Sequence, residues 1–303
     1  MAQTTRSVLF ISLSCVGDAI MTTPLLEALH QHFPEAKIDI VADKRSALLY
    51  QHCPYRARIL IKDKKKLLRG SVSLLREILK KSYDVIVDVR TDGLAYLCRG
   101  RTRYTKWQRK PYGPHAVEQL MGVIHRLHGQ ERIPPTTVWI SEEEKRFADN
   151  AVMDLPPGRW LYLAPAVTLA SKSWPIENYI RLAHNVRDIF SAVILDGSPS
   201  EASVTLSVAR ELRLPYVDLA GRTNLLQAAA VLRHASLFVG SDSGLGHVAS
   251  AVATPTLTFF SNDKPERVLP WGNRAVWLRA ADGNVSSISV EEAEKKIRGL
   301  SPD

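Results

Sequence analysis

The chain has 303 residues, of which 45% are hydrophobic and 23% are charged, and its formal net charge at pH 7 is +9. This composition is typical of a globular protein and excludes low-complexity and repeat proteins. No apolar run reaches the roughly 20 residues that cross a bilayer, and the amino-terminal residues lack a signal-peptide pattern, so we expect a cytoplasmic protein. The cysteines Cys15, Cys53 and Cys98 lack zinc-binding spacing, and we expect them to be reduced, buried thiols.

The positive charge is concentrated in two segments and suggests an acidic partner. Residues 62–81 contain Asp63 and Glu77 and the cations Lys62, Lys64, Lys65, Lys66, Arg69, Arg76, Lys80 and Lys81. Residues 99–110 contain no acid and the cations Arg99, Arg101, Arg103, Lys106, Arg109 and Lys110. Tyr104 and Trp107 interleave with the second segment, a pattern that suits single-stranded nucleic acid, with phosphorylated lipid as the competing partner. The alternative for both segments is a solvated surface, as most charge runs are.

Apolar strands alternate with amphipathic helices along the chain. We expect strands at residues 7–13, 37–42, 57–61 and 83–88 and helices at residues 19–33, 45–52, 71–81 and 112–127. After Pro156-Pro157-Gly158 the alternation restarts, with strands at residues 160–164, 192–195, 216–219, 235–239 and 256–260. This order predicts parallel β-α-β units and an α/β fold of two Rossmann-like domains, residues 1–155 and 156–303, with a cleft between them.

Ligands of such sheets bind beyond the carboxyl ends of the strands. In the first domain this rule places one group of polar residues on the same rim: Asp18, Asp88, Arg90, Thr91 and Asp92.

The most informative stretch, residues 237–252, has the pattern of a strand, a tight turn and the start of a helix. Gly244 and Gly246 allow a ligand to approach the backbone, and the unpaired N–H groups of the first helical turn suit a phosphate. Asp242 and Ser243 either hold a sugar hydroxyl or cap the helix. His247 is either a pocket residue or a core histidine. The same glycines also satisfy the dinucleotide pattern G-x-G-x-x-A, but that fingerprint normally opens the first unit of its domain.

Two further segments follow strands. Gly17-Asp18 places a carboxylate where it can take a proton from a hydroxyl, or where it caps the helix that follows. Residues 164–175 bring Thr168, Lys172 and Trp174 to the rim of the second domain, where the hydroxyl and the cation can offset charge on a leaving diphosphate. The solvated lysine is the alternative for Lys172. The chain contains neither a G-x-x-x-x-G-K-[ST] loop nor an Asp-x-Asp pair, so a kinase-type phosphate loop and the commonest metal-dependent sugar-nucleotide site lack support.

Three motifs together resemble a known family. They are Gly17-Asp18-Ala19-Ile20-Met21-Thr22-Thr23-Pro24, Lys172-Ser173-Trp174-Pro175 and Asp242-Ser243-Gly244-Leu245-Gly246-His247-Val248-Ala249-Ser250-Ala251. Their order and positions are similar to those of the ADP-heptose:lipopolysaccharide heptosyltransferases, glycosyltransferase family 9, over nearly the whole chain. The resemblance implies a GT-B fold and an inverting, metal-independent transfer of heptose from ADP-heptose to the lipopolysaccharide inner core. It implies no cofactor, because the nucleotide-sugar is a cosubstrate.

The resemblance also implies roles for individual residues. Asp18 matches the catalytic base, Lys172 and Thr168 match the groups that steady the diphosphate, and Asp242 matches the acid that holds the donor sugar. The phosphate turn corresponds to Ser243, Gly244, Gly246 and His247. The residues that we expect to contact the phosphorylated acceptor are Arg90, Arg99, Arg101, Arg103, His115 and Glu118. The basic segments would meet the acceptor or the anionic inner leaflet, which makes the protein peripheral on the inner membrane.

Departures from the family pattern leave alternatives open. Ser261-Asn262-Asp263 replaces the usual Gly-x-Thr turn, and Ala164 and Ala166 stand where the family usually has a glycine or serine beside Pro165. A same-family transferase with a different nucleotide-sugar is therefore the nearest alternative. A non-catalytic module that binds a nucleotide-sugar or nucleic acid is the second, although the retained Asp18, Lys172 and Asp242 argue against it, and we do not expect a nucleic-acid partner. A dehydrogenase or epimerase is the third.

Overall fold

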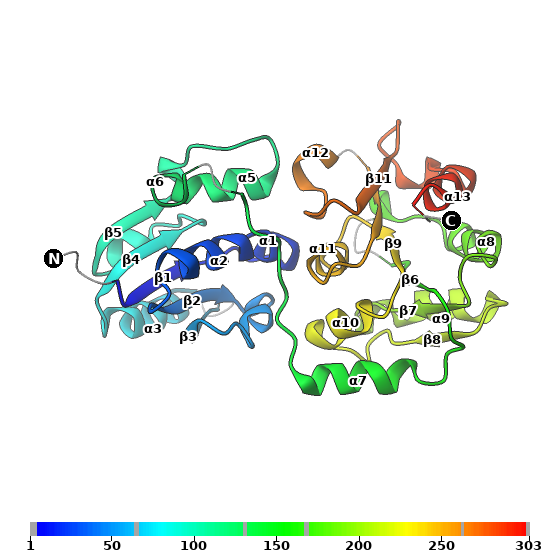
Figure 1. The fold of residues 1–303 in the computed structure, drawn as a ribbon, viewed down its shortest axis with the longest axis horizontal. Coiled ribbons are helices and arrows are strands. Elements are labelled where there is room, and N and C mark those ends of the chain that lie inside the picture. Colours follow the sequence, from blue (N-terminus) through cyan, green and yellow to red (C-terminus); the bar gives the residue numbers. More distant parts are fainter. Residues whose placement is uncertain (1–4, 64–66, 130–131, 167–169, 262–263, 301–303) are drawn as a thin grey trace. The chain divides into compact units, whose positions relative to one another are not determined.

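Figure 1 shows the fold in a computed structural model of the chain. The structure describes all residues except 1–4, 64–66, 130–131, 167–169, 262–263 and 301–303, and it describes no side chain at residues 67–71 and 170. The chain divides into two compact units, Met1–Trp139 and Ile140–Asp303. In the described part, no helix has the length and apolar character needed to span a bilayer.

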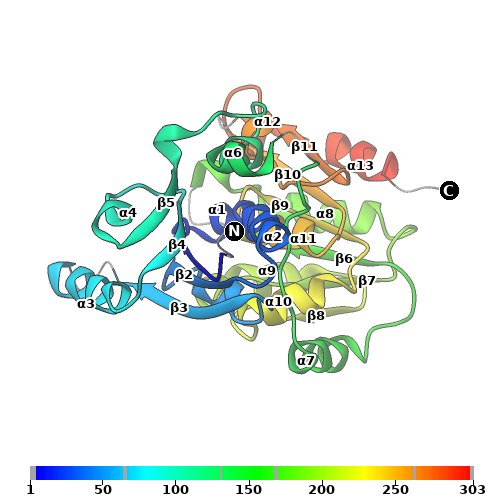
Figure 2. The same cartoon turned by 60° about the vertical axis from the view of Figure 1, so that its left-hand side comes forward.

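Unit 1 is a parallel five-stranded sheet covered by helices on both faces. In sheet order its strands are β3 (Arg56–Lys62), β2 (Lys37–Asp43), β1 (Ser7–Ile11), β4 (Tyr83–Asp88) and β5 (Gly100–Thr105). Figure 2 shows α3 (Leu67–Leu79) and α4 (Leu94–Leu97) on one side of the strands and α1 (Val16–Met21) and α2 (Thr23–His32) on the other. Leu9, Ile11 and Ile86 face the α3 side and form its buried core. Strand β5 was not expected, because its arginines hide any apolar alternation.

Thr22 divides the helix that was expected over residues 19–33. The Thr22 hydroxyl donates to the carbonyl of Ala19 at 2.7 Å, and the Thr23 hydroxyl donates to that of Ile20 at 2.8 Å. Pro24 then stands in the first turn of α2, where its missing N–H does no harm. The expected helix over residues 112–127 is likewise divided, into α5 (Ala116–Met121), a 3-10 turn and α6 (His125–His128).

Unit 2 is a parallel six-stranded sheet. In sheet order its strands are β11 (Ala275–Arg279), β10 (Thr256–Phe260), β9 (Leu237–Ser241), β6 (Trp160–Ala164), β7 (Ala192–Leu195) and β8 (Tyr216–Asp218). Its helices are α7 (Glu142–Val152), α8 (Ile176–Asn185), α9 (Ala202–Glu211), α10 (Leu225–Leu232), α11 (Gly244–Ala251), α12 (Pro265–Val268) and α13 (Val290–Arg298). Figure 1 shows α8, α9 and α13 on one side of this sheet and α10 and α11 on the other.

The division between the units falls at Trp139 and Ile140, whereas the sequence suggested 155 and 156 as the boundary. The Trp139 ring packs edge-on against Tyr55 of unit 1, with ring centroids 5.7 Å apart. Helix α7 begins just afterwards and packs against α10 of unit 2. A contact of 3.2 Å between Asp149 and His234 joins α7 to the segment that follows α10.

The three cysteines are free thiols, as expected. Cys53 and Cys98 are buried, but Cys15, at the N-cap position of α1, is exposed.

Candidate active site

In unit 2 the site begins where β9 ends and α11 starts. The amide of Asp242 donates to the carbonyl of Phe259 at 3.0 Å, which extends the β9–β10 ladder by one residue. Ser243 occupies the N-cap position, but its hydroxyl makes no capping hydrogen bond. Gly244 is the first residue of α11. The capping interpretation therefore fails for Ser243, and this helix N-terminus is suited to an anionic ligand.

Lys172 and Asp242 form a salt bridge at this turn. The Nζ atom of Lys172 lies 2.6 Å from Oδ2 of Asp242, and the two side chains are 21% and 17% exposed. The residues are 70 positions apart in the sequence, so the fold alone brings them together. Lys172 is therefore not the solvated loop lysine of the alternative interpretation. A cation and a carboxylate at a helix N-terminus present complementary charges to a ligand with a phosphate and hydroxyl groups.

Trp174 holds the segment that carries Lys172. Its side chain is fully buried, its indole N–H donates to the carbonyl of Ile288 at 2.8 Å, and its ring lies 4.6 Å from that of Phe259 between centroids. The expectation that this aromatic reaches the rim was wrong, because the indole is large and apolar enough to anchor the loop in the core. Thr168, Asn262 and Asp263 lie outside the described residues.

The remaining turn residues are less exposed. His247 is 6% exposed within α11. A Cβ atom added at Gly246 would meet Phe238, Thr258 and Pro270 at 3.5–3.6 Å, which is ordinary contact, so helix packing alone does not require a glycine there. The tighter position is Gly240 in β9, where a Cβ atom would lie 3.0 Å from the Phe238 ring.

Sequence reasoning missed Asp196, which directly follows β7. This carboxylate is 2% exposed and accepts hydrogen bonds from the Tyr162 hydroxyl at 2.5 Å, the Gly197 amide at 2.7 Å and the Thr223 hydroxyl at 3.0 Å. Burial raises the pKa of Asp196 to about 6, against the lowering effect of these donors. Ligands of parallel sheets bind beyond the carboxyl ends of the strands, and this rule predicted the rim of unit 1. Applied to β7, the same rule predicts Asp196.

In unit 1, Asp18 lies in the first turn of α1, and its side chain is partly exposed. The N-cap is Cys15, so Asp18 is not the capping residue that the alternative interpretation required. A carboxylate in the first turn is stabilised by the helix dipole.

The rim of unit 1 is a connected network. The buried Asp88 carboxylate accepts from the amides of Arg90 at 2.8 Å and Thr91 at 2.6 Å, and burial raises its pKa. The Arg90 side chain bonds to the Ser14 hydroxyl and lies 3.2 Å from Asp92. Burial raises the pKa of Asp92, but its pairs with Lys62 and Arg90 outweigh this and lower it.

Thr91 has a φ of +50°. The left-handed region is strained for a β-branched residue, and such strain is concentrated at functional sites.

The predicted acceptor residues do not form one cluster. Arg99 and Arg101 are exposed at the amino end of β5, whereas Arg90 follows the carboxyl end of β4. Arg103 donates to three backbone carbonyls, those of Ala95, Cys98 and Gly100, at 2.7–3.0 Å. Arg103 therefore fastens α4 to β5.

His115 and Glu118 form a capping box at the start of α5. The Nδ1 atom of His115 accepts from the Val117 amide at 3.1 Å, and the Glu118 carboxylate accepts from the His115 amide at 2.8 Å. These contacts give both side chains a structural function, and their contact with an acceptor stays a prediction.

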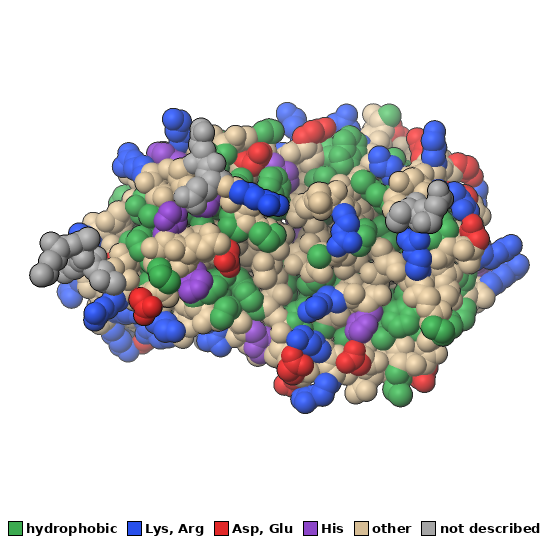
Figure 3. Space-filling model, viewed as in Figure 1, with side chains coloured by type: hydrophobic (Ala, Val, Ile, Leu, Met, Phe, Trp, Pro, Cys, Tyr) green, Lys and Arg blue, Asp and Glu red, His purple; other side chains and the backbone are tan. Residues whose placement is uncertain are grey.

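Much of the first basic segment is paired or lies outside the described side chains. In the described part, Lys62 pairs with Asp92, Lys80 lies 2.6 Å from Glu77, and Lys81 lies 3.5 Å from Asp39. Figure 3 shows Lys and Arg side chains gathered at the lower left, over the region of α3 in Figure 1. The structure describes no side chain for Lys64, Lys65, Lys66 or Arg69. No group of three or more His, Cys, Asp or Glu residues suited to a metal ion occurs among the described residues.

Solved structures share this arrangement of two parallel sheets. The glycosyl transferase family 9 protein of Veillonella parvula matches with a TM-score of 0.86 and 21% identity over 99% of this chain and 98% of that one. The Escherichia coli heptosyltransferase WaaC with ADP matches with a TM-score of 0.78 and 21% identity over 97% and 100% of the two chains. The fold is therefore the GT-B α/β fold of the glycosyltransferases.

Sequence comparison assigns the family. The profile of glycosyltransferase family 9 (heptosyltransferase) matches residues 92–298. The lipopolysaccharide core heptosyltransferase OpsX of Haemophilus influenzae is 24% identical, over 96% of this chain and 87% of the relative. The lipopolysaccharide heptosyltransferase 1 of Escherichia coli K12 is also 24% identical, over 97% and 99%. This chain belongs to glycosyltransferase family 9, as its motifs had suggested.

Proposed function

We propose that the protein transfers a heptose from ADP-heptose to the lipopolysaccharide inner core, with inversion at the anomeric carbon and without a metal ion. The observation that carries this proposal is the Lys172–Asp242 pair at the N-terminus of α11. Family membership and the printed names of the relatives support it. Related solved structures hold ADP and ADP-2-deoxy-2-fluoro heptose.

On the donor side, Lys172 exchanges its partner. The diphosphate of the donor takes the ammonium group from Asp242, and the released carboxylate accepts hydrogen bonds from hydroxyls of the sugar. The N–H groups at the start of α11 bind a phosphate oxygen. As ADP leaves, Lys172 and these N–H groups offset the developing charge, which is the task that a metal ion performs in other transferases.

On the acceptor side, Asp18 is the general base. Its carboxylate takes the proton of an acceptor hydroxyl while the hydroxyl oxygen bonds to the anomeric carbon and the bond from that carbon to the diphosphate breaks. Attack from the face opposite the leaving group inverts the configuration. Among the described arginines we assign Arg90 to the acceptor phosphates, because it follows the carboxyl end of β4. Arg103 is bound to carbonyls, and Arg99 and Arg101 lie at the opposite, amino end of β5.

The Asp18→Asn variant tests the reaction. The amide cannot take the proton, so we expect turnover to fall by about 10²–10⁴-fold. Donor affinity, measured as stabilisation against thermal unfolding by ADP-heptose, should be unchanged, because donor binding belongs to the other unit. The control is Asp242→Asn, which should lower donor affinity instead. Full activity of Asp18→Asn would contradict the assignment.

A panel of nucleotide-sugars tests the donor. The true donor stabilises the protein against unfolding by mass action and then supports transfer to truncated core acceptors. Transfer from a different nucleotide-sugar, and none from ADP-heptose, would favour the same-family alternative. Stabilisation without transfer to any acceptor would favour a binding module.

We also propose that the protein is peripheral on the inner face of the inner membrane. Tyr96, Leu97 and Trp107 form an exposed patch, with side chains 50%, 61% and 62% exposed. The rings of Tyr96 and Trp107 stack with centroids 5.6 Å apart. Tyr and Trp favour the membrane interface. The chain carries Lys106, Arg109 and Lys110 around Trp107, and each cation contributes about 1 kcal/mol near an anionic surface.

Vesicle sedimentation tests this surface. The protein should bind vesicles that contain phosphatidylglycerol more tightly than vesicles of phosphatidylcholine alone, and Trp107→Ala should weaken that binding. Trp160→Phe, on a residue of unit 2, is the aromatic control. Binding of single-stranded oligonucleotide in preference to vesicles would overturn the proposal in favour of a nucleic-acid surface.

A further inference from the structure

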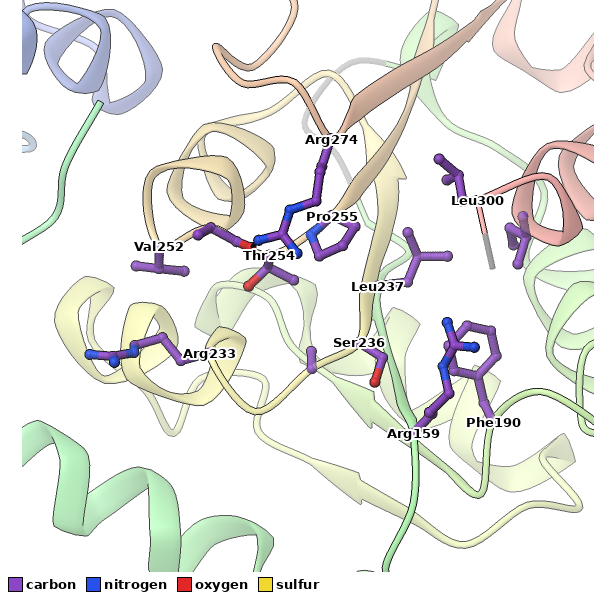
Figure 4. Close-up of a pocket in the computed structure, with 13 residues that line it drawn as sticks. Arg159, Phe190, Arg233, Ser236, Leu237, Val252, Thr254, Pro255, Arg274 and Leu300 are labelled. Carbon is purple, nitrogen blue, oxygen red and sulfur yellow. Dashed lines mark hydrogen bonds between the residues drawn. The ribbon is translucent and has the colours of Figure 1, made fainter. Parts of the chain in front are cut away.

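Unit 2 contains a cavity at the amino ends of its strands. Asp242 lies at the other edge of the sheet, beyond the carboxyl end of β9. The cavity measures about 630 Å³, within the usual range for ligand pockets. The segments that precede four strands contribute to it through Arg159 before β6, Ser236 before β9, Thr254 before β10 and Arg274 before β11. Figure 4 shows these residues around the opening.

The lining combines apolar side chains with arginines. The larger apolar members are Phe190, Leu237, Val252, Pro255, Ile297 and Leu300. The cations are Arg159, Arg233 and Arg274, and no acidic residue lines the cavity among the described residues. An uncompensated positive rim above an apolar surface is complementary to a molecule that has an anionic group and an apolar part.

Two of the arginines are held over the cavity. The Arg159 guanidinium lies over the Phe190 ring, 5.5 Å from its centroid. Arg274 donates through Nη2 to the carbonyl of Ala253, which fixes its orientation and uses one of its five N–H donors. In Figure 4, Arg274 points toward Thr254, while Arg233 points away from both other arginines. Among the described residues, no salt bridge neutralises Arg159 or Arg274.

We propose that this cavity is a second binding site, separate from the nucleotide-sugar turn, and that it binds an anionic amphiphile. The phosphate or carboxylate head of the ligand pairs with Arg274, and the Arg159 guanidinium beside Phe190 adds positive charge to the same cavity. Its alkyl or aryl part lies against Phe190, Leu237 and Leu300. Guanidinium groups suit this head because their planar donors match two oxygens of a phosphate or carboxylate. The proposal does not depend on the reaction assigned to the protein.

Octyl phosphate is the probe, and isothermal titration calorimetry of the full chain is the measurement. We expect octyl phosphate to bind more tightly than inorganic phosphate, which lacks the apolar part, and more tightly than octyl glucoside, which lacks the charge. Arg159→Gln with Arg274→Gln should weaken binding by about tenfold or more. Arg233→Gln is the matched control and should change the affinity by less than about twofold, because the Arg233 side chain points away from the other two arginines.

Three results would overturn the proposal. One is equal affinity for octyl phosphate and octyl glucoside, and another is equal affinity of the wild type and the double variant. The third is displacement of octyl phosphate by saturating ADP, which would place the probe at the nucleotide-sugar turn. Thermal unfolding checks that the double variant is folded. If it is not, Arg159→Gln and Arg274→Gln are measured singly, and each should weaken binding severalfold.

Discussion

The carboxyl edges of the two sheets are built differently. In unit 1, Asp88, Arg90 and Asp92 are bound to one another, to backbone amides and to Ser14 and Lys62. In unit 2, Lys172 and Asp242 come from two separate segments and neutralise each other through one salt bridge. The first edge is therefore fixed before any ligand binds, whereas the second has charges that a ligand can exchange for its own. A transferase needs a fixed edge to orient one substrate. It also needs exchangeable charges, because the other substrate must lose a charged leaving group.

Among the variants that test this comparison, removing the cation of unit 2 should have the largest effect. Lys172→Met leaves the leaving diphosphate without its ammonium partner, and we expect kcat/KM to fall by about 10²–10³-fold. Steady-state kinetics with the true donor measures this. Lys62→Met is the matched control, since it breaks a lysine–aspartate pair in unit 1 and should leave donor affinity unchanged. Equal losses of donor affinity in both variants would contradict the division of tasks between the units.

The buried Asp196 should make the stability of unit 2 depend on pH. Its pKa is raised from 3.8 to about 6, so the folded state retains a proton that the unfolded state releases. The contribution of Asp196 to stability should therefore fall as the pH rises from about 4 to about 6 and then level off, by about 3 kcal/mol in total. Asp196→Asn removes this slope. Denaturant unfolding across that range measures it, and parallel profiles of wild type and variant would contradict the raised pKa.

Trp174→Phe tests how Lys172 is positioned. The variant loses the hydrogen bond to the Ile288 carbonyl and leaves a cavity beside Phe259. We expect the free energy of unfolding of unit 2 to fall by about 2 kcal/mol. Donor affinity should fall with it, because the loop that carries Lys172 loses its anchor. Unchanged stability would show that the indole does not hold the loop.

Trp174 also marks what the sequence could and could not predict. The alternation of strands and helices and the order of strand, turn and helix over residues 237–252 are local patterns, so they were predicted from the residues that form them. The salt bridge between Lys172 and Asp242 depends on the packing of two distant segments. Burial of Trp174 was missed because it lies within a polar loop, and β5 was missed because Arg101 and Arg103 mask its pattern.

The smallest effects concern two residues in the left-handed region, Thr91 with φ +50° and Ala253 with φ +66°. Ala253 follows Val252, the C-cap residue of α11, and the next amide, that of Thr254, donates to the Ala249 carbonyl at 2.9 Å. Glycine is favoured at this position after a helix. Ala253→Gly should stabilise the protein by about 0.5–1 kcal/mol without changing activity. Thr91→Gly should relieve similar strain but also loosen the turn between Asp88 and Asp92, and so lower kcat. Unfolding and kinetic measurements on both variants separate these outcomes. A Thr91→Gly variant that is stabilised and fully active would show that the strained backbone at residue 91 does not contribute to activity.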